Sequence, residues 1–182
     1  MLIVKSDACD LGVGACLLRV KAASVEGVTE EMLSDPTGMR LIATDTKILS
    51  TNQQKWLTFE LEIYACYRAL RKWSSTLMQV AACRNDVAIL VMLDSTTAVS
   101  KFMSVQIPGP IDHACAKEKR FLGWMDKVSF MLHMRYKMKF KWWPGSAHDF
   151  LDLLSRCASK LQECVDERER LQHMFTMSRV TY

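Results

Sequence analysis

The chain has 182 residues, of which 49% are hydrophobic and 24% are charged, and its formal net charge is +4. This length and composition are typical of one globular domain with its own core, and no apolar run is long enough for a membrane span or a signal peptide. The seven cysteines and four histidines are scattered without zinc-ligand spacing, which argues against a zinc site and favours reduced thiols in an intracellular protein, cytoplasmic or nuclear.

The positive charge is concentrated between Lys117 and Lys141, where eight basic residues stand against two acidic residues. A basic segment of this kind is compatible with a partner that carries a phosphate backbone. It is equally compatible with a solvated protein surface, and composition alone leaves both interpretations open.

Residues 1–20 are predicted to form two strands around a tight bend, because apolar runs stand on both sides of a glycine-rich stretch. Asp7 lies at the end of the first of these strands. Gly12 and Gly14 are predicted to be turn or strand glycines and not a phosphate-binding loop, since no helix follows them.

The polar residues 21–38 contain Asp-Pro and Thr-Gly turn signals, and they are predicted to form an exposed insertion. A third strand is predicted in residues 39–50. Its apolar residues Leu41, Ala43 and Ile48 are expected to face inward.

The clearest helical pattern begins at Thr58, which is the predicted N-cap, and ends near Arg71 and Lys72. Apolar residues recur there at steps of three and four, and the two cations suit the C-terminal end of a helix dipole. Glu62 lies beside the apolar stripe. A carboxylate in that position needs a partner, because burying it alone is costly.

The run VAILVML (87–93) has no polar alternation, which predicts a central strand covered on both faces. Asp94 ends this strand, and the Ser-Thr-Thr that follows is a good cap for a short helix over 98–103. A longer helix is predicted over 113–134 and an alternating strand over 135–143.

A final helix is predicted to begin near Asp149. The resulting order, β-β-β-α-β-α-α-β-α, favours a single α/β fold with helices on both faces of the sheet.

Four carboxylates occupy the same edge of this predicted architecture, and they are Asp7, Glu62, Asp94 and Asp152. Two of them end strands and two lie on helices. Ligands of open sheets lie beyond the carboxyl ends of the strands. The layout therefore predicts that these acids converge on divalent metal ions.

Five collinear blocks between residues 2 and 157 carry a family resemblance: SDACDLGVGACLL, the segment from RLIATDTKILS to ALRKW, VMLDSTTAV, the segment from RFLGW to KWWPG, and PGSAHDFLDLLSR. They resemble the ribonuclease H type-1 domain of reverse-transcriptase polyproteins from gypsy-class LTR retrotransposons. The resemblance implies a ribonuclease H-like domain over 1–157, followed by a helical extension or linker over 158–182. It also implies a mixed five-stranded sheet, with three antiparallel N-terminal strands and then parallel strands.

The activity implied by the resemblance is cleavage of the RNA strand of an RNA–DNA hybrid with two Mg²⁺ ions, or Mn²⁺ in their place. The family's catalytic acids fall on Asp7, Glu62, Asp94 and Asp152. Asp7 is expected to bridge the ions, with Glu62 and Asp94 holding one and Asp152 the other. Glu60 competes for the helix position, but spacing to ALRKW favours Glu62 and leaves Glu60 near solvent.

His148 precedes the last acid in a loop, and a catalytic role and a loop or capping role are both open. Contacts to the nucleic acid are expected near the acids and on the last strand. The candidates are Ser6, Ser95, Thr96, Thr97, Lys139 and Lys141. The two lysines could equally form the solvent-exposed face of an edge strand.

The implied partners are an RNA–DNA hybrid and the polymerase and integrase domains of a polyprotein, with no membrane. A catalytically inactive hybrid-binding or protein-docking module is the alternative from another functional class. A third hypothesis is a DNA strand transferase of the DDE type on the same fold, which would not need Glu62.

Overall fold

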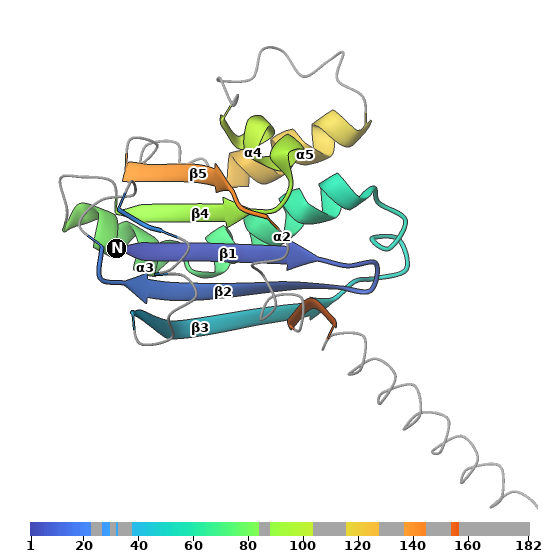
Figure 1. Ribbon diagram of the computed structural model, residues 1–182. Coiled ribbons are helices and arrows are strands. Elements are labelled where there is room, and N and C mark those ends of the chain that lie inside the picture. Colours follow the sequence, from blue (N-terminus) through green and yellow to red (C-terminus); the bar gives the residue numbers. More distant parts are fainter. Residues whose placement is uncertain are drawn as a thin grey trace, which may run out of the picture.

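The structure is a computed structural model that describes residues 1–22, 27–29, 32, 38–83, 88–103, 116–127, 137–144 and 154–156. A mixed five-stranded sheet with the strand order β3-β2-β1-β4-β5 forms its centre (Figure 1). The strands are β1 (Leu2–Ala8), β2 (Gly12–Val20), β3 (Met39–Ile48), β4 (Ile89–Leu93) and β5 (Met138–Trp142).

The first three strands pair antiparallel, whereas β4 pairs parallel with both β1 and β5. In the β1–β4 register, Lys5 is opposite Met92, so two residues further on Asp7 is level with Asp94. The carboxyl ends of parallel strands lie at the same edge of a sheet. The predicted fold class is confirmed, and its topology brings two of the predicted acids to one edge.

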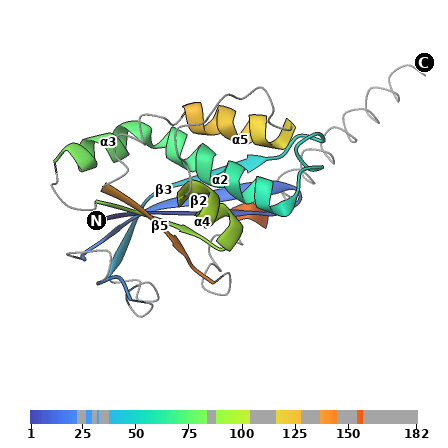
Figure 2. The same ribbon diagram turned by 90° about the horizontal axis from the view of Figure 1, so that it is seen from above.

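Four helices are described: α2 (Thr58–Lys72), α3 (Ser74–Ala82), α4 (Thr96–Met103) and α5 (Ala116–Lys127). Figure 2 shows α2, α3 and α5 on one side of the sheet. The larger core lies between them and the inward residues of β1, β2 and β4. No helix in these described parts of the chain is long and apolar enough to cross a membrane.

The opposite face of the sheet carries a second, smaller core that includes Ile3, Leu90 and Trp143. Leu154, in a short helical stretch over 154–156, packs against this core. Every residue of β4 is buried, because apolar groups cover it from both sides, as the uninterrupted apolar run predicted.

Two local predictions were wrong, and one helix was missed. The residue that caps α2 is Leu57 and not Thr58, and α3 was not predicted as a separate helix. Glu60 is buried at 6% exposure, although it was expected near solvent. Its Oε2 accepts a hydrogen bond from the Leu57 backbone N–H at 2.9 Å, and its Oε1 pairs with Arg120 at 3.5 Å.

The prediction for β3 was wrong at Leu41, which is 47% exposed. Asp45 is the buried residue that sequence analysis missed, at 6% exposure. Its carboxylate pairs with Arg68 at 2.6 Å and with Lys72 at 2.5 Å, so these ion pairs tie β3 to α2.

Several predicted segments lie partly or wholly outside the described residues. They are most of the insertion over 21–38, the helix beyond 127, the start of the strand at 135 and the extension over 158–182. The cysteines of the described residues, which are Cys9, Cys16, Cys66 and Cys83, are free thiols.

Candidate metal centre

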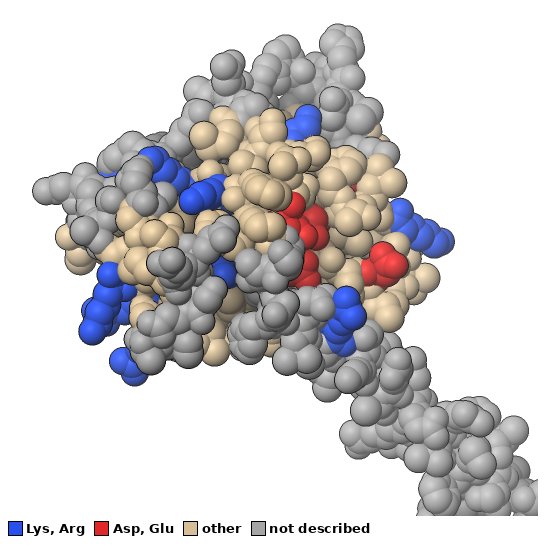
Figure 3. All heavy atoms as spheres, in the orientation of Figure 1, with Lys and Arg blue, Asp and Glu red and all other residues tan. Residues whose placement is uncertain are grey.

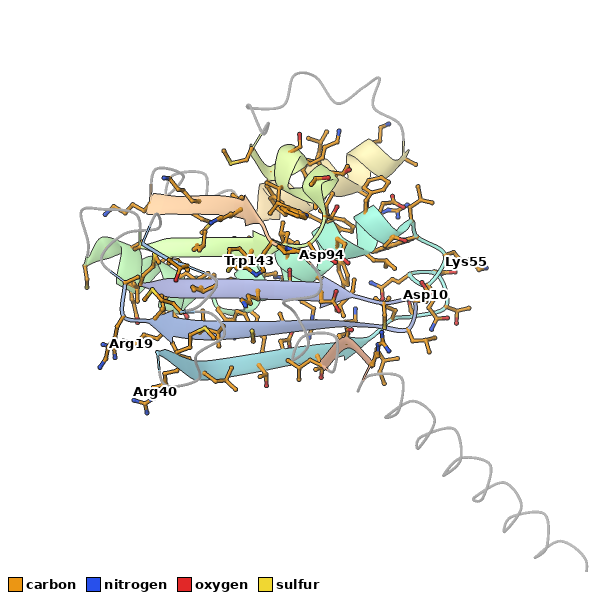
Figure 4. The ribbon with its side chains drawn as sticks, in the orientation of Figure 1. Asp10, Arg19, Arg40, Lys55, Asp94 and Trp143 are labelled. Carbon is orange, nitrogen blue, oxygen red and sulfur yellow. The ribbon has the colours of Figure 1, made fainter. Side chains whose placement is uncertain are left out.

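Asp7, Glu62 and Asp94 come together from three different elements. Each offers one carboxylate oxygen, and these oxygens all lie within 4.8 Å of one another. Asp7 is the second-last residue of β1, Glu62 lies on α2, and Asp94 directly follows β4. Figure 4 places Asp94 just beyond the arrowhead of β4, and acidic side chains reach the surface near this end of the sheet in Figure 3.

Helix α2 brings Glu62 beneath the strand ends because its apolar face packs on β1 and β2. Glu62 is only 3% exposed. The pKa of Glu62 is raised to about 9, first by burial and then by the neighbouring charges of Asp94 and Asp7, whereas a hydrogen bond from the Ala8 backbone acts to lower it. Without a cation, the cluster therefore holds a proton at neutral pH.

When all three acids are ionised, two oxygens of this cluster are buried acceptors without a donor among the described residues. Glu62 Oε2 and Asp94 Oδ1 have no hydrogen-bond partner among the described residues. Such groups are rare in folded proteins and call for an explanation. A hard divalent cation supplies one, since Mg²⁺ prefers carboxylate oxygens and would reverse the repulsion between the acids. The residues present fit a divalent metal ion.

The backbone around Asp94 is held from two sides. Ser95 Oγ accepts a hydrogen bond from the Ala98 N–H at 3.1 Å and so caps α4, as predicted. The Trp142 indole Nε1–H donates to the Asp94 carbonyl oxygen at 2.8 Å. Trp142 is 47% exposed, so a fixed aromatic ring lies open beside the cluster.

Asp7 is held by a residue that sequence analysis did not single out. Ser155 Oγ donates to Asp7 Oδ2 at 2.8 Å, and Ser155 is fully buried. The two residues are 148 positions apart, so no local pattern in the sequence indicates the contact.

Comparison with known proteins identifies the family of the chain. The family described as the RNase H-like domain found in reverse transcriptase matches residues 1–103, a segment that includes all three clustered acids. The chain belongs to this family. No curated protein sequence matches the chain.

Solved ribonuclease H structures have the same fold. The N-terminal RNase H domain of a Mycobacterium tuberculosis protein aligns with a TM-score of 0.51 at 10% identity, covering 88% of this chain and 97% of that one. RNase H1 from the halophilic archaeon Halobacterium salinarum aligns with a TM-score of 0.52 at 11% identity, covering 87% and 97%. At such identities the likeness supports the fold alone.

The other predicted site residues of this RNase H-like domain fall into three groups. Asp152 and His148 lie outside the described residues. Ser6 is 1% exposed, and its buried hydroxyl cannot reach a nucleic acid in this structure, so the contact predicted for it was wrong. The reason is the alternation of β1, which turns residue 6 toward the larger core.

The remaining candidates, Ser95, Thr96, Thr97, Lys139 and Lys141, are at least partly exposed. The two threonines begin α4 next to Asp94, and the two lysines lie on β5, which pairs with β4. Lys141 Nζ lies 5.0 Å from the centre of the Trp143 ring.

Proposed function

We propose that this RNase H-like domain is a metal-dependent endonuclease that hydrolyses the RNA strand of RNA–DNA hybrids, as part of a retroelement reverse transcriptase. One observation carries the proposal. Three carboxylates from separate elements meet at the strand ends, and two of their buried oxygens lack a donor among the described residues.

Asp7, Glu62 and Asp94 would hold the metal, proposed as two Mg²⁺ ions, or Mn²⁺ in their place, with Asp152 as a fourth ligand. Bound ions of this kind supply an activated water and neutralise phosphate charge. The chain's own contribution is to hold the acids together against their mutual repulsion. Helix α2, which carries Glu62, also keeps water away from one side of the cluster.

The proposal for Asp152 is supported by the position of Ser155, which contacts Asp7. Consecutive Cα atoms are about 3.8 Å apart, so the Cα of residue 152 is at most about 11 Å from that of Ser155. This spacing along the chain is compatible with Asp152 as a further ligand of the same metal site. His148 lies four residues before Asp152, and both a role in proton transfer and a loop role remain open for it.

The nucleic acid is proposed to contact exposed residues around the cluster. Thr96 and Thr97 are exposed beside Asp94, and Ser95 retains donor capacity although its oxygen caps α4. Lys139 and Lys141 suit the phosphate backbone because they are exposed cations on the neighbouring strand.

The gypsy-class LTR element, with polymerase and integrase domains as neighbours in its polyprotein, is the proposed origin. It depends on the five sequence blocks that resemble that class, including TFELEIYACYRALRKW and the PG–LSR segment.

The direct test is cleavage of a hybrid with a labelled RNA strand, with Mg²⁺ or with EDTA. The Asp7→Asn and Asp94→Asn variants should each lose more than about 100-fold in rate, since each removes a charged metal ligand. Asp10→Asn is the matched control, because Asp10 is exposed in the turn after β1 and is not part of the cluster.

Two outcomes would refute the nuclease proposal. A wild-type chain that binds the hybrid without cutting it would indicate an inactive binding module. Full activity in Glu62→Gln would instead favour the strand-transferase hypothesis, since that chemistry does not require an acid on the first long helix.

A further inference from the structure

We infer that Ser155 is a positioning residue, which holds the Asp7 carboxylate in the orientation that binds a divalent cation. The inference depends on the proposed metal function of the cluster and names a residue that the catalytic acids themselves do not include. Its basis is a buried hydroxyl that reaches the first strand from the far end of the described chain.

The contact has the geometry of a strong hydrogen bond. Ser155 Oγ lies 2.8 Å from Asp7 Oδ2, and the serine is fully buried. Hydrogen bonds to an ionised acceptor are stronger than neutral ones, and burial protects this one from competing water. A carboxylate accepts several partners, so the bond fixes the side-chain rotation of Asp7 and leaves it able to bind a cation.

The sheet has a space for Ser155 at the position paired with Asp7. Gly14 is the cross-strand partner of Asp7 in the β1–β2 register. A Cβ atom on Gly14 would lie 2.8 Å from the Ser155 backbone nitrogen and 3.0 Å from the Leu154 Cβ. Glycine at this position therefore lets the segment over 154–156 approach the backbone beside the metal ligand.

Two further contacts hold the same segment. Leu154 packs against the second core, and Cys9 Sγ lies 3.5 Å from the Ser155 carbonyl oxygen, within reach of a weak thiol donation. These contacts and the glycine make the position of Ser155 independent of its own hydroxyl. Removing the hydroxyl should thus leave the segment in place and remove its hydrogen bond to Asp7.

Ser6, which lies next to Asp7 in β1, provides a comparison with Ser155. Ser6 is equally buried, but its Oγ has no hydrogen-bond partner among the described residues. A buried hydroxyl close to the cluster is therefore not enough. Of these two serines, it is Ser155 that donates to Asp7.

The test measures Mn²⁺ binding to the full chain, with the electron paramagnetic resonance signal of the free ion as the readout. This measurement needs neither substrate nor turnover. Ser155→Ala should weaken Mn²⁺ binding about 10- to 100-fold, the usual effect of removing an outer-shell partner of a ligand. Ser155→Thr keeps the hydroxyl and should retain most of the affinity. Ser6→Ala is the matched control and should bind Mn²⁺ like the wild type.

Circular dichroism of each variant establishes whether it is folded before affinities are compared. If the extra methyl group of Ser155→Thr prevents folding, Ser155→Cys replaces it, because it keeps the shape but donates weakly, and it should bind as poorly as Ser155→Ala. Equal affinity in the wild type and in folded Ser155→Ala would overturn this inference alone. A wild type that binds no Mn²⁺ would overturn the proposed metal function and this inference with it.

Discussion

The metal-free domain should lose stability as the pH rises, because one buried acid must give up a proton. The pKa of Glu62 is raised from an ordinary value of 4.5 to about 9, first by burial and then by the charges of Asp94 and Asp7. A raised pKa means that the folded chain binds the proton more tightly than the unfolded chain. The stabilisation is therefore fully present below about pH 4.5 and is lost as the pH approaches 9.

The size of the effect follows from proton linkage. One proton held by the folded state but not by the unfolded state changes the free energy of unfolding by about 1.4 kcal/mol per pH unit. Between pH 6 and pH 8, both inside this window, the loss should reach up to about 2.7 kcal/mol. Glu62→Gln cannot ionise, so this contribution to the pH dependence should disappear.

The assay is urea denaturation followed by circular dichroism, at both pH values, with EDTA and with Mg²⁺. Magnesium at 100 times the dissociation constant that applies at pH 8 should restore about 2.7 kcal/mol at that pH. The same concentration should restore less at pH 6, where binding must displace a more firmly held proton. Asp10→Asn, at an exposed acid outside the cluster, should keep the wild-type slope. Equal slopes in the wild type and Glu62→Gln would refute the reasoning.

Three other substitutions test separate parts of the structure. Asp45→Asn, which removes ion pairs to two partly exposed cations of α2, should lower the free energy of unfolding by about 1–3 kcal/mol in urea denaturation without changing hybrid cleavage. Gly14→Ala, whose Cβ would lie 2.8 Å from Ser155 N, should weaken Mn²⁺ binding at least about 10-fold in calorimetric titration. Trp142→Phe, which removes the donor to the Asp94 carbonyl, should slow hybrid cleavage up to about 10-fold, whereas an unchanged rate would show that the bond is dispensable.

The strand-end acids could be predicted because the apolar pattern indicates which segments form buried strands and where those strands end. The run ending at Leu93 has no polar residue, so it must be covered on both faces, and a central parallel strand delivers the next residue to the carboxyl edge. Asp94 follows directly. The same argument applies to Asp7, whose strand pairs with β4 in parallel.

Alternation failed in β3 for an identifiable reason. The pairing with β2 is irregular between Leu17 and Leu18, which are opposite Ala43 and Leu41, so Ile42 is an extra residue in β3. One extra residue reverses which side chains face the core. Leu41 consequently lies on the opposite side of the strand from Ala43, whereas Asp45 follows Ala43 by two residues and stays on the inward side. The sequence contains no pattern that predicts the irregularity.

The partners of the acids were missed for a different reason. Ser155 and Trp142 contact residues that are 148 and 48 positions away in the chain. Hydrophobic periodicity indicates which side of a helix or strand faces the core. It gives no information about which distant side chains contact that element. The signal that could have identified Gly14 was its position opposite Asp7 across the bend, where a missing side chain leaves space for another segment.

Glu60 and Glu62, the two candidates for the acid on the first long helix, differ in what surrounds their carboxylates. Both are buried, at 6% and 3% exposure, so burial does not decide between them. Glu60 accepts a hydrogen bond from the Leu57 N–H and pairs with Arg120, which offsets the cost of removing its charge from water. Glu62 instead faces two more carboxylates and keeps one oxygen without a donor among the described residues. The fold therefore satisfies the carboxylate of Glu60 and leaves that of Glu62 in an unfavourable setting. This difference is the strongest physical reason to propose Glu62 as the metal ligand.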